Sequence, residues 1–147
     1  MTTRDFIAKR YNVAGQEQWC SSVFADSGGF IYSYGYHYPL AFNIGGYDFV
    51  NEAGYSTTTG KHIAWARQAL NYQYIGVKLS RDDRYTINSG YASDNDKLAV
   101  IRGALERELK TIMDKMEGKP RKDTRVYEQL KDEHERVYNL ITKLEVV

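Results

Sequence analysis

The chain has little of what would tie it to a covalent framework or to a membrane. Its 147 residues include one cysteine, Cys20, which excludes an internal disulfide. No window approaches the roughly 20 apolar residues of a membrane helix, and the start MTTRDFIAKRY lacks the apolar stretch of a secretory signal. These absences predict a cytoplasmic protein that does not act on a membrane.

The chain also lacks a strong net charge. Twenty Lys and Arg stand against nineteen Asp and Glu, which leaves a formal charge of +1. A protein that mainly neutralises phosphates needs a positive excess, so nucleic-acid binding is disfavoured. The three histidines do not have the paired spacing of common zinc motifs, and we predict no metal and no cofactor.

Aromatic residues are abundant in the first part of the chain. In the stretch FIYSYGYHYPLAF, residues 30–42, every even position is Phe, Tyr or Leu. Because side chains alternate across an extended strand, this pattern predicts one strand with a wide aromatic face. Such a face either fills a core or offers a ligand a stacking surface, and both interpretations stay open.

Turn residues divide the rest of the first part into short elements. QWCSSVF is predicted as a strand that ADSGG joins to the aromatic strand, and Gly45-Gly46 as the tight turn before a third strand, YDFVN. STTTGKHIAWARQAL predicts a helix packed on the sheet and capped by Thr57 or Thr58. YIGVKL and RYTIN predict a further hairpin.

The second part is helical in pattern. Ser93 and Asp96 form an approximate capping box, and apolar residues then recur at spacings of three and four to about Glu117, and again from about Asp123 onward. We therefore predict an α+β fold with two parts. Residues 1–92 form an antiparallel β-meander with a packed helix, and residues 93–147 a long C-terminal antiparallel helical hairpin.

The length of this hairpin predicts a homodimer. Each helix of about 24 residues is roughly 36 Å long, more than the first part needs for cover. Apolar residues left for a second copy include Val100, Ala104, Met113, Val126 and Leu140. The residues predicted to form the dimer are Leu105, Leu109, Ile112, Val137 and Leu140.

The segment GYSTTTGKH shares features with a phosphate-binding loop but departs from its pattern. Gly54 and Gly60 are separated by five residues instead of four, and His62 stands where Ser or Thr would bind magnesium. Free backbone N–H groups at the helix start can still hold an anion, and ordinary capping by threonines is the alternative. The candidate ligand-binding residues are Tyr34 and Tyr36 for stacking, with Lys61, His62 and Arg67 facing phosphate.

No catalytic group is apparent. Cys20 lies inside a predicted strand, where a small buried residue is expected, and the carboxylates mark turns or solvated helix faces. Since no nucleophile, base and orienting group occur together, we predict that the chain is not an enzyme.

Residues 20–70 resemble a family of small bacteriophage-encoded proteins in which an aromatic hairpin precedes a Tyr-Ser-x-Thr-Thr-x-Lys-His-Ile segment. The matching residues are Tyr55, Ser56, Thr58, Thr59, Lys61, His62 and Ile63. The resemblance implies a phage or mobile-element origin, and it supplies no catalytic residue and no substrate.

The leading interpretation is a non-enzymatic, phage-derived interaction protein in the cytoplasm of the host cell. It is expected to inhibit a bacterial defence system by binding a host protein, by analogy with other small phage proteins. The alternative is a nucleotide-binding protein that sequesters a signalling nucleotide. A nucleic-acid-binding protein is the weaker third interpretation.

Overall fold

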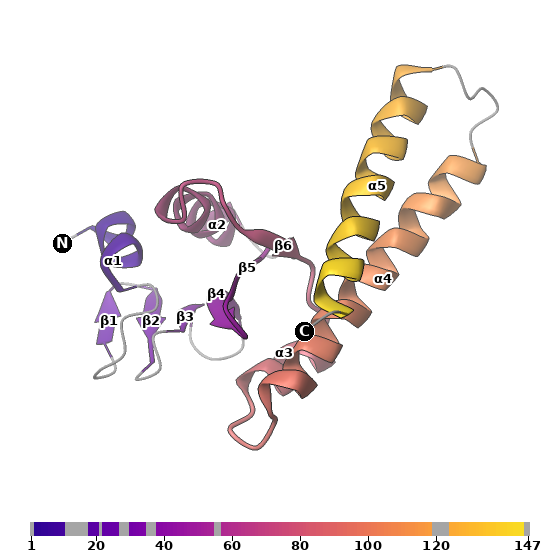
Figure 1. Ribbon diagram of the computed structural model, residues 1–147. Helices are drawn as coiled ribbons and strands as arrows, with labels where there is room; N and C mark the ends of the chain where they lie inside the picture. The colour runs from indigo at the N-terminus through magenta and orange to yellow at the C-terminus, as the bar shows by residue number, and fades with distance from the viewer. Residues whose placement is uncertain are drawn as a thin grey trace.

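The computed structural model describes residues 2–10, 18–20, 22–26, 30–34, 38–54, 57–118 and 124–145. Within these ranges the chain forms six strands and five helices (Figure 1). A mostly antiparallel sheet is followed by two long helices that pack against each other. The fold is α+β, as the sequence predicts.

The six strands lie in the sheet in the order in which they occur in the chain. They are β1 (Gln18–Cys20), β2 (Val23–Ala25), β3 (Ile31–Ser33), β4 (Pro39–Ile44), β5 (Tyr47–Asn51) and β6 (Ile75–Val77). Strands β1 to β5 form an antiparallel meander, whereas β6 pairs with β5 in parallel. A parallel pair needs a crossover, and the helix α2 (Thr57–Ala69) lies in that crossover.

The prediction of one long aromatic strand is wrong. The stretch forms two strands, β3 and β4, which pair antiparallel with Ile31 opposite Ala41. Tyr34 follows β3 with a φ of 61°, and this left-handed conformation ends the extended strand. The aromatic residues therefore do not share one face: Phe42 and Tyr38 belong to different core clusters.

Two other predicted strands also differ. QWCSSVF is divided into β1 and β2, which pair with each other. RYTIN lies in the helix α3 (Arg81–Asn88). A capping box begins this helix, because Ser80 Oγ accepts from the Asp83 N–H and Asp83 Oδ2 accepts from the Ser80 N–H. The helix α1 (Thr3–Arg10) has no counterpart among the predicted elements.

The turn between β4 and β5 confirms the sequence prediction. Gly45 and Gly46 have φ angles of 62° and 85°, and they connect Ile44 to its partner Tyr47. This is the backbone that a two-residue hairpin with two glycines favours. A Cβ atom at Gly45 would lie 3.1 Å from Leu98 Cδ1, so this turn also approaches the helical hairpin closely.

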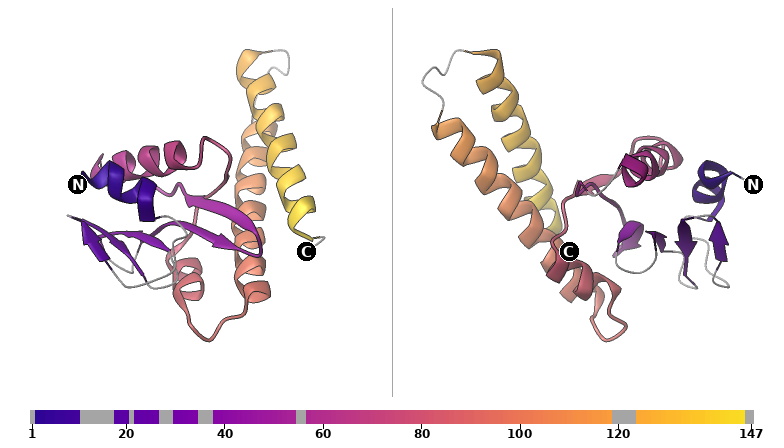
Figure 2. Two further views of the ribbon diagram at one scale, coloured as in Figure 1. Left: turned by 60° about the vertical axis from the view of Figure 1, so that its left-hand side comes forward. Right: turned by 180° about the vertical axis from the view of Figure 1, so that it is seen from behind.

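One hydrophobic core lies between the sheet and the helices α1 and α2, which cover the same side of the sheet (Figure 2). Its buried residues are Phe6, Ile7, Val23, Ala25, Ile31, Tyr38, Leu40, Ala41, Val50, Ile63 and Ala66.

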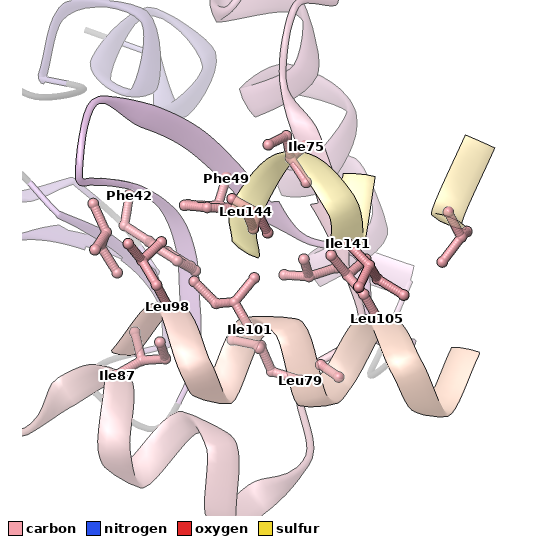
Figure 3. Packing of buried hydrophobic residues seen from close by; sticks show 14 of the residues in the cluster. Phe42, Phe49, Ile75, Leu79, Ile87, Leu98, Ile101, Leu105, Ile141 and Leu144 are labelled. Atoms are coloured by element: carbon pink, nitrogen blue, oxygen red, sulfur yellow. The ribbon is translucent and has the colours of Figure 1, made fainter. Parts of the chain in front are cut away.

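A second core joins the sheet to α3 and to the two long helices, α4 (Asp94–Glu117) and α5 (Arg125–Glu145). Figure 3 shows Phe42 and Phe49 of the sheet beside Leu98, Ile101 and Leu144 of the long helices. The other buried members are Ile44, Ile75, Val77, Leu79, Ile87, Ala104, Leu105, Ile112, Leu130, Val137 and Ile141. One continuous core therefore includes residues of both predicted parts of the chain.

The helical hairpin of α4 and α5 projects from this core, with its connecting end away from the sheet (Figure 1). The predicted capping box is confirmed, since Ser93 Oγ accepts from the Asp96 N–H and Asp96 Oδ2 from the Ser93 N–H.

The residues predicted to form a dimer lie inside the single chain. Leu105, Ile112 and Val137 are buried in the second core, and Leu109 and Leu140 are partly buried against it. Their apolar surface packs within one chain, and their predicted contact with a second copy stays a prediction. The homodimer itself stays a prediction.

We expect Leu105→Ala to lower the free energy of unfolding by about 2 to 5 kcal/mol, because the substitution leaves a cavity in the core. Met113→Ala is the matched control on the same helix, since Met113 is 44% exposed. Its cost should be about 1 kcal/mol or less. Denaturant unfolding of the two variants measures both values, and equal losses would contradict this placement of the core.

Candidate functional site

The helix α2 carries three of the five predicted ligand residues, and it turns them in different directions. Lys61 is exposed, His62 is 2% exposed, and Arg67 is partly buried. Successive helical residues are about 100° apart around the axis, so Lys61 and His62 do not face one ligand together. Tyr36 lies outside the described residues.

His62 is enclosed by hydroxyl groups. Its Nδ1 lies 2.8 Å from Ser33 Oγ at the end of β3, and its Nε2 lies 3.5 Å from Ser22 Oγ between β1 and β2. Thr59, three residues earlier on α2, places its Oγ1 3.3 Å from Ser33 Oγ. No pattern in the sequence indicates this network, because Ser33 and His62 are 29 residues apart.

Burial lowers the pKa of the His62 imidazole from the ordinary value of 6.5, because it disfavours the protonated form. The rings of Tyr34 and Trp65 lie against it, with centroids 6.0 and 5.8 Å from the imidazole centroid. Because His62 is buried and its ring nitrogens lie against hydroxyl groups of the fold, it is not available to a phosphate, and the prediction that it faces phosphate is wrong.

In some enzymes a histidine acts as the base that activates a serine nucleophile, and His62 lies beside two serine hydroxyls. Ser33 has no exposed surface, so a substrate does not reach its Oγ in this conformation. Ser22 is more accessible, but its 3.5 Å separation from Nε2 is at the outer limit of a hydrogen bond. The hydrogen bonds of this network connect α2 to the sheet. The absence of enzyme activity stays a prediction.

Arg67 is also engaged inside the fold. Its guanidinium pairs with the Glu52 carboxylate, which follows β5, and the Tyr74 hydroxyl lies 3.5 Å from Glu52 Oε2. Burial is the largest single influence and lowers the pKa of Arg67, but the hydrogen bond to Glu52, the charge of Glu52 and the nearby Tyr74 together leave that pKa raised. Since its charge already has a partner, the prediction that Arg67 faces phosphate is wrong as well.

Tyr34 and Lys61 are the predicted ligand residues that the structure leaves exposed. The Tyr34 ring is 44% exposed, and its N–H donates to the Ser22 carbonyl at 2.6 Å. The sequence predicted three cationic side chains around one phosphate, and of these only Lys61 is exposed. The role of Tyr34 and Lys61 in ligand binding stays a prediction.

A different surface feature occurs at the connecting end of the helical hairpin. A groove of about 190 Å³ there is lined by Met113, Met116, Glu117, Tyr127 and His134. Met113 is among the residues predicted from the sequence to leave apolar surface outside the hairpin seam.

Further apolar surface accompanies this groove on α5. Val126, next to Tyr127 in the chain, is 49% exposed, and Tyr138 is 56% exposed. The ring of Tyr138 stacks on that of His134 at a centroid distance of 6.5 Å and an interplanar angle of 4°. We call the groove together with Val126 the hairpin tip, and Tyr138 lies beside it, further along α5. Tyr138 was not identified from the sequence, because its exposure depends on how α5 packs.

No family model, curated protein or solved structure matches the chain. Within the described ranges, no helix has the length and apolar character needed to cross a membrane. Among the same residues, no three His, Cys, Asp or Glu side chains are grouped in a way that could hold a metal ion.

The buried His62 makes the stability depend on pH. Because its folded pKa is lowered, the unfolded state binds the proton more readily below pH 6.5. Its contribution is therefore complete above that value and is lost as pH falls towards the folded pKa, by at most about 1.4 kcal/mol per pH unit. We expect His62→Gln to reduce this loss in urea unfolding at pH 7.5 and 5.5.

His134→Gln is the matched control, because His134 lies on α5 and is only partly buried. This variant should keep the acid sensitivity of the unaltered chain. Loss of the sensitivity in the His134 variant, with its retention in the His62 variant, would contradict the assignment.

Proposed function

We propose that the chain is a non-enzymatic interaction protein that binds another protein through the hairpin tip. The observation that supports this most directly is the groove between α4 and α5 with its exposed apolar neighbours Met113, Val126 and Tyr138. Clustered apolar side chains in water are unfavourable, and they often mark an interaction surface.

The chemistry of the hairpin tip fits an apolar segment of a partner protein. Met113 and Met116 are unbranched and adaptable, which suits a surface that accepts another helix or loop. The charged groups beside them, Glu117 and Arg125, can form the polar rim of such an interface. The base of the hairpin is anchored in the second core, so binding at the tip does not require the fold to open.

The more specific form of the proposal is a phage-derived inhibitor that binds a host defence protein in the host cytoplasm. It rests on the resemblance of residues 20–70 to phage-encoded proteins, and the exposed apolar groove of the hairpin tip supports it. The alternative, sequestration of a nucleotide by Lys61, His62 and Arg67, has less support because His62 and Arg67 have partners within the chain.

A photo-crosslinking residue in place of Val126 tests the proposal in a bacterial lysate. We expect it to capture a defined host protein, and Met113→Glu in the same chain should abolish the capture by placing a charge in the groove. The crosslinker at Tyr91, a fully exposed residue far from the tip in the sequence, is the control. Equal capture from both positions would contradict binding at the tip.

Light scattering separates a foreign partner from a second copy. A monomer at micromolar concentration leaves the tip to another protein. A dimer that Met113→Glu dissociates would show that a second copy covers the tip, and it would contradict this proposal while confirming the predicted homodimer.

A further inference from the structure

Arg84, in the first half of α3, is a partly buried cation without a counter-ion among the described residues. The ion pairs found there belong to Arg67, Arg107 and Arg136. The Nε–H group of Arg84 is inaccessible to solvent and has no hydrogen-bond acceptor in the described part of the chain. Since a buried N–H group without an acceptor is unfavourable, this arrangement suggests that an acceptor is bound from outside the chain.

Asn51, the last residue of β5, provides a second donor without an acceptor. Its side chain is fully buried, and its Oδ1 accepts from the N–H groups of Ala53 and Leu79 at 3.2 and 3.3 Å. Its Nδ2 has no acceptor among the described residues. Buried amide groups usually have their hydrogen bonds satisfied, so this donor also calls for a missing acceptor.

The two unsatisfied donors lie in the same corner of the fold. Leu79, which contacts Asn51, is followed by Ser80, whose carbonyl accepts from the Arg84 N–H at 3.0 Å. The Tyr38 hydroxyl lies 3.1 Å from the Asn51 carbonyl oxygen, with donation towards it.

Tyr38 links this corner to Arg84 electrostatically. Burial raises the pKa of Tyr38 to about 12, while the nearby Arg84 charge opposes that rise and Glu52 adds to it. Glu52 already pairs with Arg67. The corner therefore contains two buried donors, the Arg84 Nε–H and the Asn51 Nδ2 group, without acceptors among the described residues.

The topology favours a ligand at this edge. Strands β5 and β6 are parallel, and their carboxyl ends lie side by side, since the Glu52 N–H donates to the Val77 carbonyl at 2.6 Å. The carboxyl ends of parallel strands are where open sheets commonly bind ligands.

We propose that the corner formed by Tyr38, Asn51 and Arg84 binds a phosphate-type oxyanion. Arg84 supplies the charge, because a guanidinium presents several parallel donors to tetrahedral oxyanions and carboxylates. Asn51 supplies a neutral donor. The exposed Lys78, which follows β6, adds positive charge near this edge.

Inorganic phosphate is the probe for a first test, with thermal unfolding and calorimetric titration in a phosphate-free zwitterionic buffer. We expect phosphate to bind the full chain and to raise its melting temperature. Arg84→Gln should abolish both effects, whereas Arg81→Gln, which removes an exposed charge from the same helix, should retain both. In the absence of phosphate, Arg84→Gln should melt no lower than the unaltered chain, because it removes an unpaired charge.

Asn51→Asp gives an independent test at nearly constant shape. It keeps the oxygen that accepts from Ala53 and Leu79, and it places a carboxylate where an unsatisfied donor was. We expect this variant to fold and to lose phosphate binding. Undiminished phosphate binding by either Arg84→Gln or Asn51→Asp would overturn the proposal, as would failure of the unaltered chain to bind phosphate and AMP.

AMP and acetate distinguish the source of the oxyanion. Binding of AMP at least tenfold tighter than phosphate would identify a nucleotide ligand, and equal affinities would identify a free phosphate group. Either result supports the site, provided that Arg84→Gln abolishes the binding of that ligand. Acetate binding as tight as that of phosphate would overturn the assignment to a phosphate-type anion.

Discussion

The rest of the structure depends on the packing in the second hydrophobic core, which the sheet and the helical hairpin share and which we call the shared core. Phe42 and Phe49 of the sheet pack with Leu98, Ile101 and Leu144 of the long helices (Figure 3). Burying each such side chain contributes roughly 1.5 to 3 kcal/mol relative to leaving it in water. Because the first turns of α4 and the last turn of α5 are both held there, the hairpin leaves the sheet in a defined direction.

Two cation–π contacts supplement this core. Lys97 of α4 lies over the Phe30 ring at 5.6 Å, and Lys143 of α5 lies over the Tyr47 ring at 5.3 Å. Both rings are partly buried against the shared core. Each of the helices α4 and α5 therefore contacts the sheet near the base of the hairpin. The hairpin tip, at the other end, makes no such contact among the described residues and remains exposed.

The elements that the sequence predicts well are those specified by neighbouring residues. The Gly45-Gly46 turn and the Ser93–Asp96 capping box depend on a few adjacent positions, and both form as expected. The long helices repeat their apolar spacing over several turns, which makes the pattern unambiguous.

The predictions were wrong for short segments whose apolar spacing fits both the two-residue repeat of a strand and the 3.6-residue repeat of a helix. RYTIN alternates like a strand, yet Tyr85 is exposed and Ile87 is buried, which places them on opposite faces as a helix does. The local capping box of Ser80 and Asp83 decides the outcome. In the aromatic stretch, the left-handed Tyr34 interrupts an alternation that would otherwise have continued.

The candidate sites were harder to predict because their partners are distant in sequence. In the sequence, Lys61, His62 and Arg67 form a plausible set of cations. In the fold, however, His62 is bonded to Ser33, 29 residues away, and Arg67 to Glu52, 15 residues away. The unpaired state of Arg84 likewise depends on what lies around it in three dimensions.

Hydrogen exchange during denaturant titration tests the central claim, that sheet and hairpin form one cooperative unit through a shared core. Peptides covering β4 and β5, the first turns of α4 and the last turns of α5 report on the three sides of that core. The account predicts that all three lose protection together in one transition. Exchange of the hairpin amides at a denaturant concentration where the sheet remains protected would contradict it.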